Sequence, residues 1–193
     1  MPIEVNVDDR LREIAAATLD VARESGVNAV SYRSVARAMG GSTAIVTNYL
    51  PTRAALLKNA LDHTMALWHV EMARVVAEAR PGDRLRTLAT WSCTTEPDDL
   101  VIRHMLIHAL AELGHPVAIL SDLQRDADEH RQALLQAATD DGVPDPAALA
   151  DAIYLICHGF YLSTVEARDA WPDSRASAAI DAVLASGGLR SRS

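Results

Sequence analysis

Apolar residues recur every three or four positions along almost the whole chain, and each run stops at a glycine or a proline. The first run includes Ile14, Thr18 and Val21 and ends at Gly26, a common helix terminator. Four later runs begin at or near a proline: Pro97, Pro116, Pro146 and Pro172. A proline in the first turn of a helix costs little, because the N–H it lacks would have no partner there. No stretch alternates in the manner of a strand, so the sequence predicts an all-α fold.

We expect about nine helices. Alanine and leucine dominate the composition and aromatic residues make up only 4%, which favours helices. After the first helix, we expect helices over Tyr32–Met39, Ser42–Tyr49, Thr52 to Pro81, Asp83–Thr94, Pro97–Leu113, Pro116–Thr139, Pro146–Arg168 and Pro172–Ser186. Ser31, Ser42 and Thr52 are the expected N-caps of the second, third and fourth helices.

The bulk composition indicates a globular protein of the cytoplasm. Of the 193 residues, 49% are hydrophobic and 23% are charged, as in ordinary folded domains. Cys93 and Cys157 fit no disulfide or zinc pattern and are expected to be buried thiols. The first nine residues lack the layout of a signal peptide, and no uninterrupted apolar run approaches the ~20 residues of a membrane span.

The charge is distributed unevenly. The net charge is -8, yet residues 25–60 contain no acid and four bases: Arg33, Arg37, Arg53 and Lys58. A chain that is acidic overall can still present one face that phosphate tolerates. A chance gap in the spacing of acids is the alternative.

The second and third expected helices are unusually short and are joined by Gly40-Gly41. Two short helices with a glycine turn, flanked by further helices, are typical of a helix-turn-helix, whose second helix enters the DNA major groove. We therefore expect an N-terminal helix-turn-helix domain over residues 1–51 and a helical ligand-binding and dimerisation domain over 52–193.

The sequence of this segment resembles the DNA-binding domain of the TetR family of bacterial repressors over about 45 residues, from Ile14 to Leu57. The resemblance is carried by Ile14, Ala17, Gly26, Ser31, Arg33, Val35, Ala36, Gly40, Ser42, Tyr49, Leu50, Pro51, Arg53, Leu56 and Leu57. It departs from the family at Thr47, where an aromatic is common, and at Ala22, where a bulky apolar residue is common. The resemblance implies a DNA-binding transcriptional repressor, and not an enzyme, that a small molecule releases from its operator.

The third helix is the expected reader of base edges. Thr43, Ala44, Thr47 and Asn48 would face the bases, where methyl groups suit thymine and an amide suits adenine. The expected contacts to the DNA backbone are Ser31, Tyr32, Arg33, Ser42, Tyr49 and Arg53. Core packing is the alternative for Tyr49, and a solvated charge is the alternative for Arg53.

One short helix reads too little DNA for useful specificity, so we expect a homodimer that reads a palindromic operator. The last two helices carry small and apolar residues, and in the TetR family these helices pair with their copies. The predicted interface residues are Ala152, Leu155, Gly159, Leu162, Ile180, Val183 and Leu184. Packing within their own chain is the alternative.

The middle helices would enclose a small-molecule effector, expected to be apolar or aromatic. The candidate lining residues are Met65, Trp68, Met72, Trp91, His104, His108 and Tyr154, with His158 as a further residue that faces inward. Plain core packing is the alternative for each. His104 and His108 share one helix face, so the rival function is a metal-binding protein or an enzyme, but no third ligand is evident and we expect neither metal nor cofactor.

Overall fold

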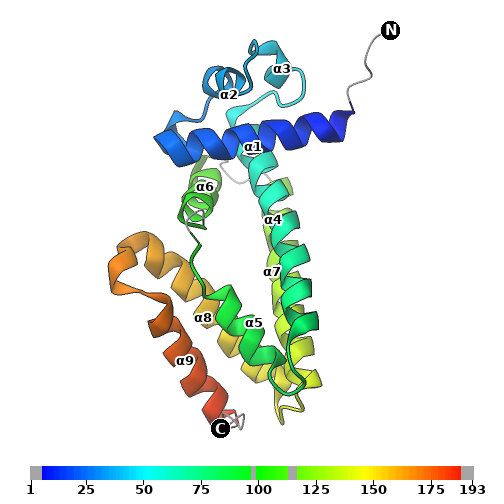
Figure 1. The fold of residues 1–193 in the computed structure, drawn as a ribbon, viewed down its shortest axis with the longest axis vertical. Coiled ribbons are helices and arrows are strands. Elements are labelled where there is room, and N and C mark those ends of the chain that lie inside the picture. The colour runs from blue at the N-terminus through cyan, green and yellow to red at the C-terminus, as the bar shows by residue number, and fades with distance from the viewer. Residues whose placement is uncertain (1–5, 97–98, 113–116, 188–193) are drawn as a thin grey trace. The chain divides into compact units, whose positions relative to one another are not determined.

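The computed structural model describes residues 6–96, 99–112 and 117–187. Within these residues there are helices and no strands (Figure 1). The α-helices are α1 (Val7–Ser25), α2 (Tyr32–Ala38), α3 (Ala44–Thr47), α4 (Arg53–Glu78), α5 (Arg84–Ser92), α6 (Asp99–Glu112), α7 (Val117–Asp140), α8 (Pro146–Ala167) and α9 (Asp173–Ser186). The predicted all-α fold is confirmed.

Most helix ends follow the predicted chemistry. Ser31 caps α2 through a capping box with Ser34, and the Thr52 hydroxyl accepts a 3.0 Å hydrogen bond from the Ala55 N–H at the start of α4. Pro146 lies in the first turn of α8. Two 3₁₀ turns that the periodicity did not predict follow α1 and α8: η1 (Val27–Ala29) and η2 (Arg168–Ala170).

The third helix is shorter than predicted. It covers Ala44–Thr47 rather than Ser42–Tyr49, and no side chain caps its N-terminus. The expected cap by Ser42 is therefore wrong: the Ser42 carbonyl, not its hydroxyl, accepts a hydrogen bond, from the Ile45 N–H at 3.1 Å. A single turn is stabilised by packing rather than by its own hydrogen bonds, so a cap residue alone does not set its length.

Backbone contacts divide the chain into two compact units. The first comprises residues 1–67 and 97–119, and the second comprises residues 68–96 and 120–193. Sequence alone did not indicate that α6 packs with the N-terminal helices. The predicted boundary after residue 51 separates DNA binding from ligand binding and dimerisation, and it stays a prediction.

The first unit is built around one apolar core. Its buried residues come from α1 to α4 and α6 and include Ile14, Val30, Val35, Val46, Leu56, Leu57 and Met105. The Asn59 side chain of α4 donates a 2.8 Å hydrogen bond to the Leu11 carbonyl of α1, which ties these helices together. The short helices α2 and α3 are thus held on a packed support.

The second unit has its own core, formed by parts of α4, α5, α7, α8 and α9. Its fully buried residues include Leu85, Leu88, Leu134, Ile153, Ile180 and Leu184. The carboxylate of Asp141 accepts hydrogen bonds from the N–H groups of Gly82 and Leu85, both at 2.9 Å, and so supplies the cap of α5 from a distant part of the chain. Cys93 and Cys157 are buried free thiols in this core, with sulfur atoms 3.6 Å apart.

Candidate functional site

The helices α2 and α3 are joined by a tight turn. Gly40 has a φ of 68°, a left-handed conformation that favours glycine. The following Gly41 N–H donates a 2.9 Å hydrogen bond to the Ala36 carbonyl, which closes the end of α2. The chain therefore reverses within a few residues and presents α3 beside α2 (Figure 1).

Helix α3 has one inward and one outward face. Val46 is fully buried in the core of the first unit, and Ile45 packs against it. The four residues predicted to read bases, Thr43, Ala44, Thr47 and Asn48, are all exposed. The outward face therefore offers hydroxyl, methyl and amide groups, which are the groups that hydrogen-bond or contact base edges in a groove.

Two arginines beside this face have no anionic partner within the described part of the chain. Arg33 and Arg37 lie four residues apart on α2, so they share one side of the helix, and both are exposed. Lys58, in contrast, forms a 2.6 Å ion pair with Asp62. The local positive charge of the first unit is thus carried largely by α2. Arg37 lies in the acid-free stretch of residues 25–60 but is not among the residues predicted to contact DNA. Its spacing of four residues from Arg33 could have identified it as a second candidate.

Arg53 is engaged inside the first unit. Its guanidinium donates hydrogen bonds to the carbonyl of Val30 at 2.8 Å and to the carbonyl of Val27 at 2.7 Å. These bonds tie the start of α4 to the segment that leads into α2. A phosphate contact by Arg53 stays a prediction, but the structure gives its guanidinium a bracing role.

The two tyrosines predicted to grip the DNA backbone are turned toward the core. Tyr32 and Tyr49 are half-buried and pack against the core of the first unit. The hydroxyl oxygen of Tyr32 is buried and has no hydrogen-bond partner among the described residues, so it does not face solvent where a phosphate would lie. For Tyr32 the DNA contact stays a prediction, and the structure shows its ring packed against the core at the start of α2. Of the predicted serines, Ser31 caps α2 and Ser42 is exposed.

The second unit gathers an aromatic cluster from four helices. The cluster consists of Trp68 and His69 of α4, Trp91 of α5, His130 of α7, and Tyr154, His158 and Tyr161 of α8. Ring centroids of neighbouring members lie 4.2 to 6.4 Å apart, the range of direct aromatic contact. The rings therefore fill the space between the helices themselves, and a bound molecule would have to separate them.

His130 is the most buried member of this cluster. It is 4% exposed, and its Nε2 lies 3.1 Å from the Ser92 hydroxyl oxygen. Burial, followed by the neighbouring imidazoles of His158 and His69, lowers the pKa of His130 to about 4. His130 is therefore uncharged at neutral pH.

The structure brings together only part of the predicted effector set. Trp68, Trp91 and Tyr154 belong to the aromatic cluster, and Met72 is buried in the core of the same unit. Met65, His104 and His108 belong to the first unit and are not members of this cluster. Sequence reasoning missed His69, His130 and Tyr161. The i, i+4, i+7 spacing of Tyr154, His158 and Tyr161 could have identified Tyr161, but nothing in the sequence relates His130 to Trp68.

A separate hollow of about 440 Å³ lies where α8 is followed by α9. Its lining is largely polar and comprises Thr95, Arg168, Asp169, Trp171, Pro172 and Asp173. The hollow contains no residue of the aromatic cluster, so the two features are distinct.

Helix α8 carries an exposed apolar face. Leu155 is 68% exposed and Leu162 is 54% exposed, and the exposed Gly159 lies between them at helical spacing. By length and hydropathy, Pro146–Ala170 is the one described stretch that could cross a membrane, but its other face, with Ile153 and Phe160, is buried in the second unit. Such a pattern is typical of a core helix that has one uncovered side.

Two residues of the predicted dimer interface are not on the surface. Ile180 and Leu184 are fully buried in the core of their own unit, so their assignment to an interface is wrong. Their spacing of four residues marks the inward face of α9, which packs on α8 and α5 (Figure 1). Ala152 and Val183 are half-buried and remain candidates together with Leu155, Gly159 and Leu162.

No family model matches the sequence, and no curated protein matches it significantly. Solved structures do match over nearly the whole chain. A TetR transcription regulator from Haloarcula marismortui is 21% identical, with a TM-score of 0.79 over 93% of this chain and 98% of that one. A transcriptional regulator from Rhodococcus sp. Rha1 is 19% identical, with a TM-score of 0.76 over 92% of this chain and 95% of that one. SmeT, solved as a complex with triclosan, is 18% identical, with a TM-score of 0.70 and 95% of each chain covered.

Proposed function

We propose that this chain, which has the fold of TetR-type transcription regulators, is a sequence-specific DNA-binding repressor that a small molecule releases from its operator. The observation that carries the proposal is the outward face of α3. Thr43, Ala44, Thr47 and Asn48 are exposed on a single helical turn whose other side is anchored by the buried Val46. A short, rigidly supported helix with small polar side chains fits the major groove.

The DNA backbone would be held mainly by α2. The exposed Arg33 and Arg37 lie next to α3 and can reach phosphates, which positions the protein without specifying sequence. Arg53 would act indirectly, because it holds the segment that carries α2 in place. Since α3 contains no arginine, we expect contacts with thymine methyls and adenine edges rather than a bidentate guanine contact.

We further propose that the repressor is a homodimer formed through α8 and α9. The exposed Leu155, Gly159 and Leu162 form an apolar stripe that water would otherwise contact. A glycine within a helix costs about 1 kcal/mol relative to alanine, and the close approach of a second helix would offset that cost. Two copies would then present two α3 helices to successive turns of DNA, about 34–36 Å apart.

The aromatic cluster is the proposed effector site. Its tryptophan and tyrosine rings and the uncharged His130 suit an apolar or aromatic molecule. SmeT, which shares the fold, was solved with triclosan, a molecule of that kind. Because the rings now contact one another, a ligand that inserts between them would move α4, α7 and α8 apart. The ligand would shift the equilibrium between the DNA-binding form and the released form. The size of that shift is limited by how much more tightly the ligand binds the released form.

The rival function, a metal site or an active centre on His104 and His108, has less support. His104 is exposed and donates its Nδ1 hydrogen to the Leu100 carbonyl, 2.7 Å away on its own helix. Neither His104 nor His108 lies within a cluster of three potential metal ligands among the described side chains. A regulator of transcription acts where the chromosome is, so we propose a cytoplasmic location.

Selection from a random pool of duplex DNA tests the proposal. We expect the full chain to enrich a two-fold symmetric site with half-sites about one helical turn apart. Recovery of no common sequence, together with no DNA binding at low salt, would overturn it. Addition of an aromatic compound such as triclosan then separates a ligand-controlled repressor from an architectural DNA-binding protein, because only the former releases the selected site.

A further inference from the structure

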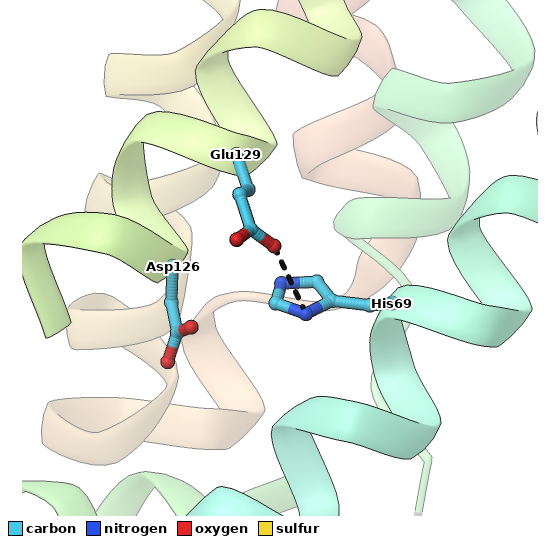
Figure 2. Close-up of side chains that lie close together, drawn as sticks. All are labelled: His69, Asp126 and Glu129. Carbon is cyan, nitrogen blue, oxygen red and sulfur yellow. Dashed lines mark ion pairs between the residues drawn. The ribbon is translucent and has the colours of Figure 1, made fainter. Parts of the chain in front are cut away.

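A histidine and two acids of the second unit lie close together outside the DNA-facing surface. His69 comes from α4, and Asp126 and Glu129 come from one side of α7 at a spacing of three residues. Figure 2 shows the three side chains near one another, with Glu129 of α7 and His69 of α4 facing each other. One ligand atom from each residue lies within 4.8 Å of the other two.

The histidine has an unused nitrogen. Its Nδ1 lies 3.3 Å from the Glu129 carboxylate, while its Nε2 is buried and has no partner among the described residues. A neutral imidazole has one N–H donor and one acceptor nitrogen, and a buried polar atom without a partner costs about 1–3 kcal/mol. A cation shared with Glu129 would be bound by Nδ1, the nitrogen that faces that carboxylate, and the ring hydrogen would then lie on Nε2.

The acids are also incompletely neutralised. The Asp126 side chain is only 14% exposed, and the guanidinium of Arg125 lies 3.6 Å from its carboxylate and 3.8 Å from that of Glu129. These ion pairs are long and Arg125 is largely exposed, so solvent screens them and they offset the burial of Asp126 only in part. Glu129 is 49% exposed, so a cation held between the two carboxylates would mainly compensate the buried Asp126.

We infer that His69, Asp126 and Glu129 form a binding site for one divalent transition-metal ion of the zinc class. Imidazole with carboxylate oxygens suits zinc, manganese, cobalt and nickel, whereas magnesium and calcium prefer oxygen ligands alone. Donor atoms around a tetrahedral zinc ion are ~3.3 Å apart, given bond lengths of about 2.0–2.2 Å. Small side-chain rotations would bring the three ligand atoms from their present spacing to that distance. Three protein ligands leave a fourth position open to water.

The site lies outside the proposed DNA-binding surface, so ion binding is tested without DNA. Zn²⁺ is titrated into the full chain after chelation and dialysis, with heat of binding and competition against a colorimetric chelator as readouts. We expect one Zn²⁺ per chain. Co²⁺ in its place should give the visible absorption of a low-coordinate site with nitrogen and oxygen ligands.

Three substitutions locate the ion: His69→Gln, Asp126→Asn and Glu129→Gln. Each should weaken Zn²⁺ binding at least 10-fold, because outer-shell partners alone contribute 10- to 100-fold. Two matched controls, His63→Gln on α4 and Asp128→Asn on α7, should bind as the unmodified chain does. Circular dichroism confirms that each variant is folded, and Glu129→Asp, which keeps the carboxylate, should retain measurable binding. Equal affinity in the His69→Gln variant and its control, or Zn²⁺ binding only in the millimolar range, would overturn the proposal.

Discussion

Arg53 braces the segment that leads into α2. Its guanidinium satisfies the carbonyls of Val27 and Val30, which lie in the segment between α1 and α2. Sequence similarity marks Arg53 as functionally important but cannot distinguish a phosphate contact from a brace. The distinction depends on where the carbonyls of η1 lie, and a sequence pattern does not predict that.

We expect Arg53→Ala to lower the free energy of unfolding by about 2 kcal/mol, since hydrogen bonds from a charged donor contribute about 1.5–3 kcal/mol. Urea unfolding followed by circular dichroism measures the change. Arg33→Ala is the matched control, because its exposed side chain should alter stability by less than about 0.5 kcal/mol. Equal stability of the two variants would contradict the bracing role.

Arg33 and Arg37 should show the opposite behaviour. Removing either side chain should leave the fold intact and weaken binding to every DNA sequence alike, because phosphate contacts carry no sequence information. The slope of log affinity against log salt concentration should fall by about 1 for each lost contact. Fluorescence anisotropy over a range of salt concentrations measures this slope. An unchanged slope in both variants would place the DNA elsewhere on the first unit.

Cys93 and Cys157 yield a prediction about reactivity. Their hydrogen bond, together with burial, raises the pKa of the Cys157 thiol above its ordinary value. Only a thiolate attacks an alkylating reagent rapidly. Iodoacetamide in mildly alkaline buffer should therefore label the native chain far more slowly than the urea-unfolded chain, as mass spectrometry would show. Rapid labelling of the native chain would mean that the second unit opens readily.

At the scale of helices, the sequence was most informative where local chemistry sets the boundary. A serine, a threonine and a proline located the starts of α2, α4 and α8 closely, because capping and the missing proline N–H act within one turn. It was less informative for α3, whose single turn depends on the burial of Val46. It also misassigned Ile180 and Leu184, because periodicity shows that a helix has an apolar face but not which neighbour covers it.

The uncovered face of α8 leads to a prediction for the proposed dimer. Leu155→Asp together with Leu162→Asp should yield a folded monomer, because each copy of the interface loses two leucines worth about 2 kcal/mol each. Light scattering at micromolar concentration measures the mass. Leu67→Asp, at an equally exposed leucine of α4, should keep the mass of the unmodified chain. A monomeric unmodified chain would contradict the dimer itself.

In the whole molecule, the two separately packed units carry different proposed tasks. The first unit holds α2 and α3 on its own core, and the second holds the aromatic cluster and the exposed face of α8. The helical pattern and the acid-free window allowed the first task to be predicted from the sequence. The composition of the aromatic cluster could be predicted only in part, because it depends on how four helices pack in space.

We propose above all that the outward face of α3 reads the base sequence. Parallel selections from one random DNA pool, with the unmodified chain and with the Thr47→Ala, Asn48→Ala double variant, test it most directly. We expect the unmodified chain to enrich a palindromic site, and the variant to bind DNA but lose preference at symmetric positions within each half-site, at a cost of about 1–3 kcal/mol per lost base contact. Enrichment of the same site to the same degree by both proteins would contradict the claim.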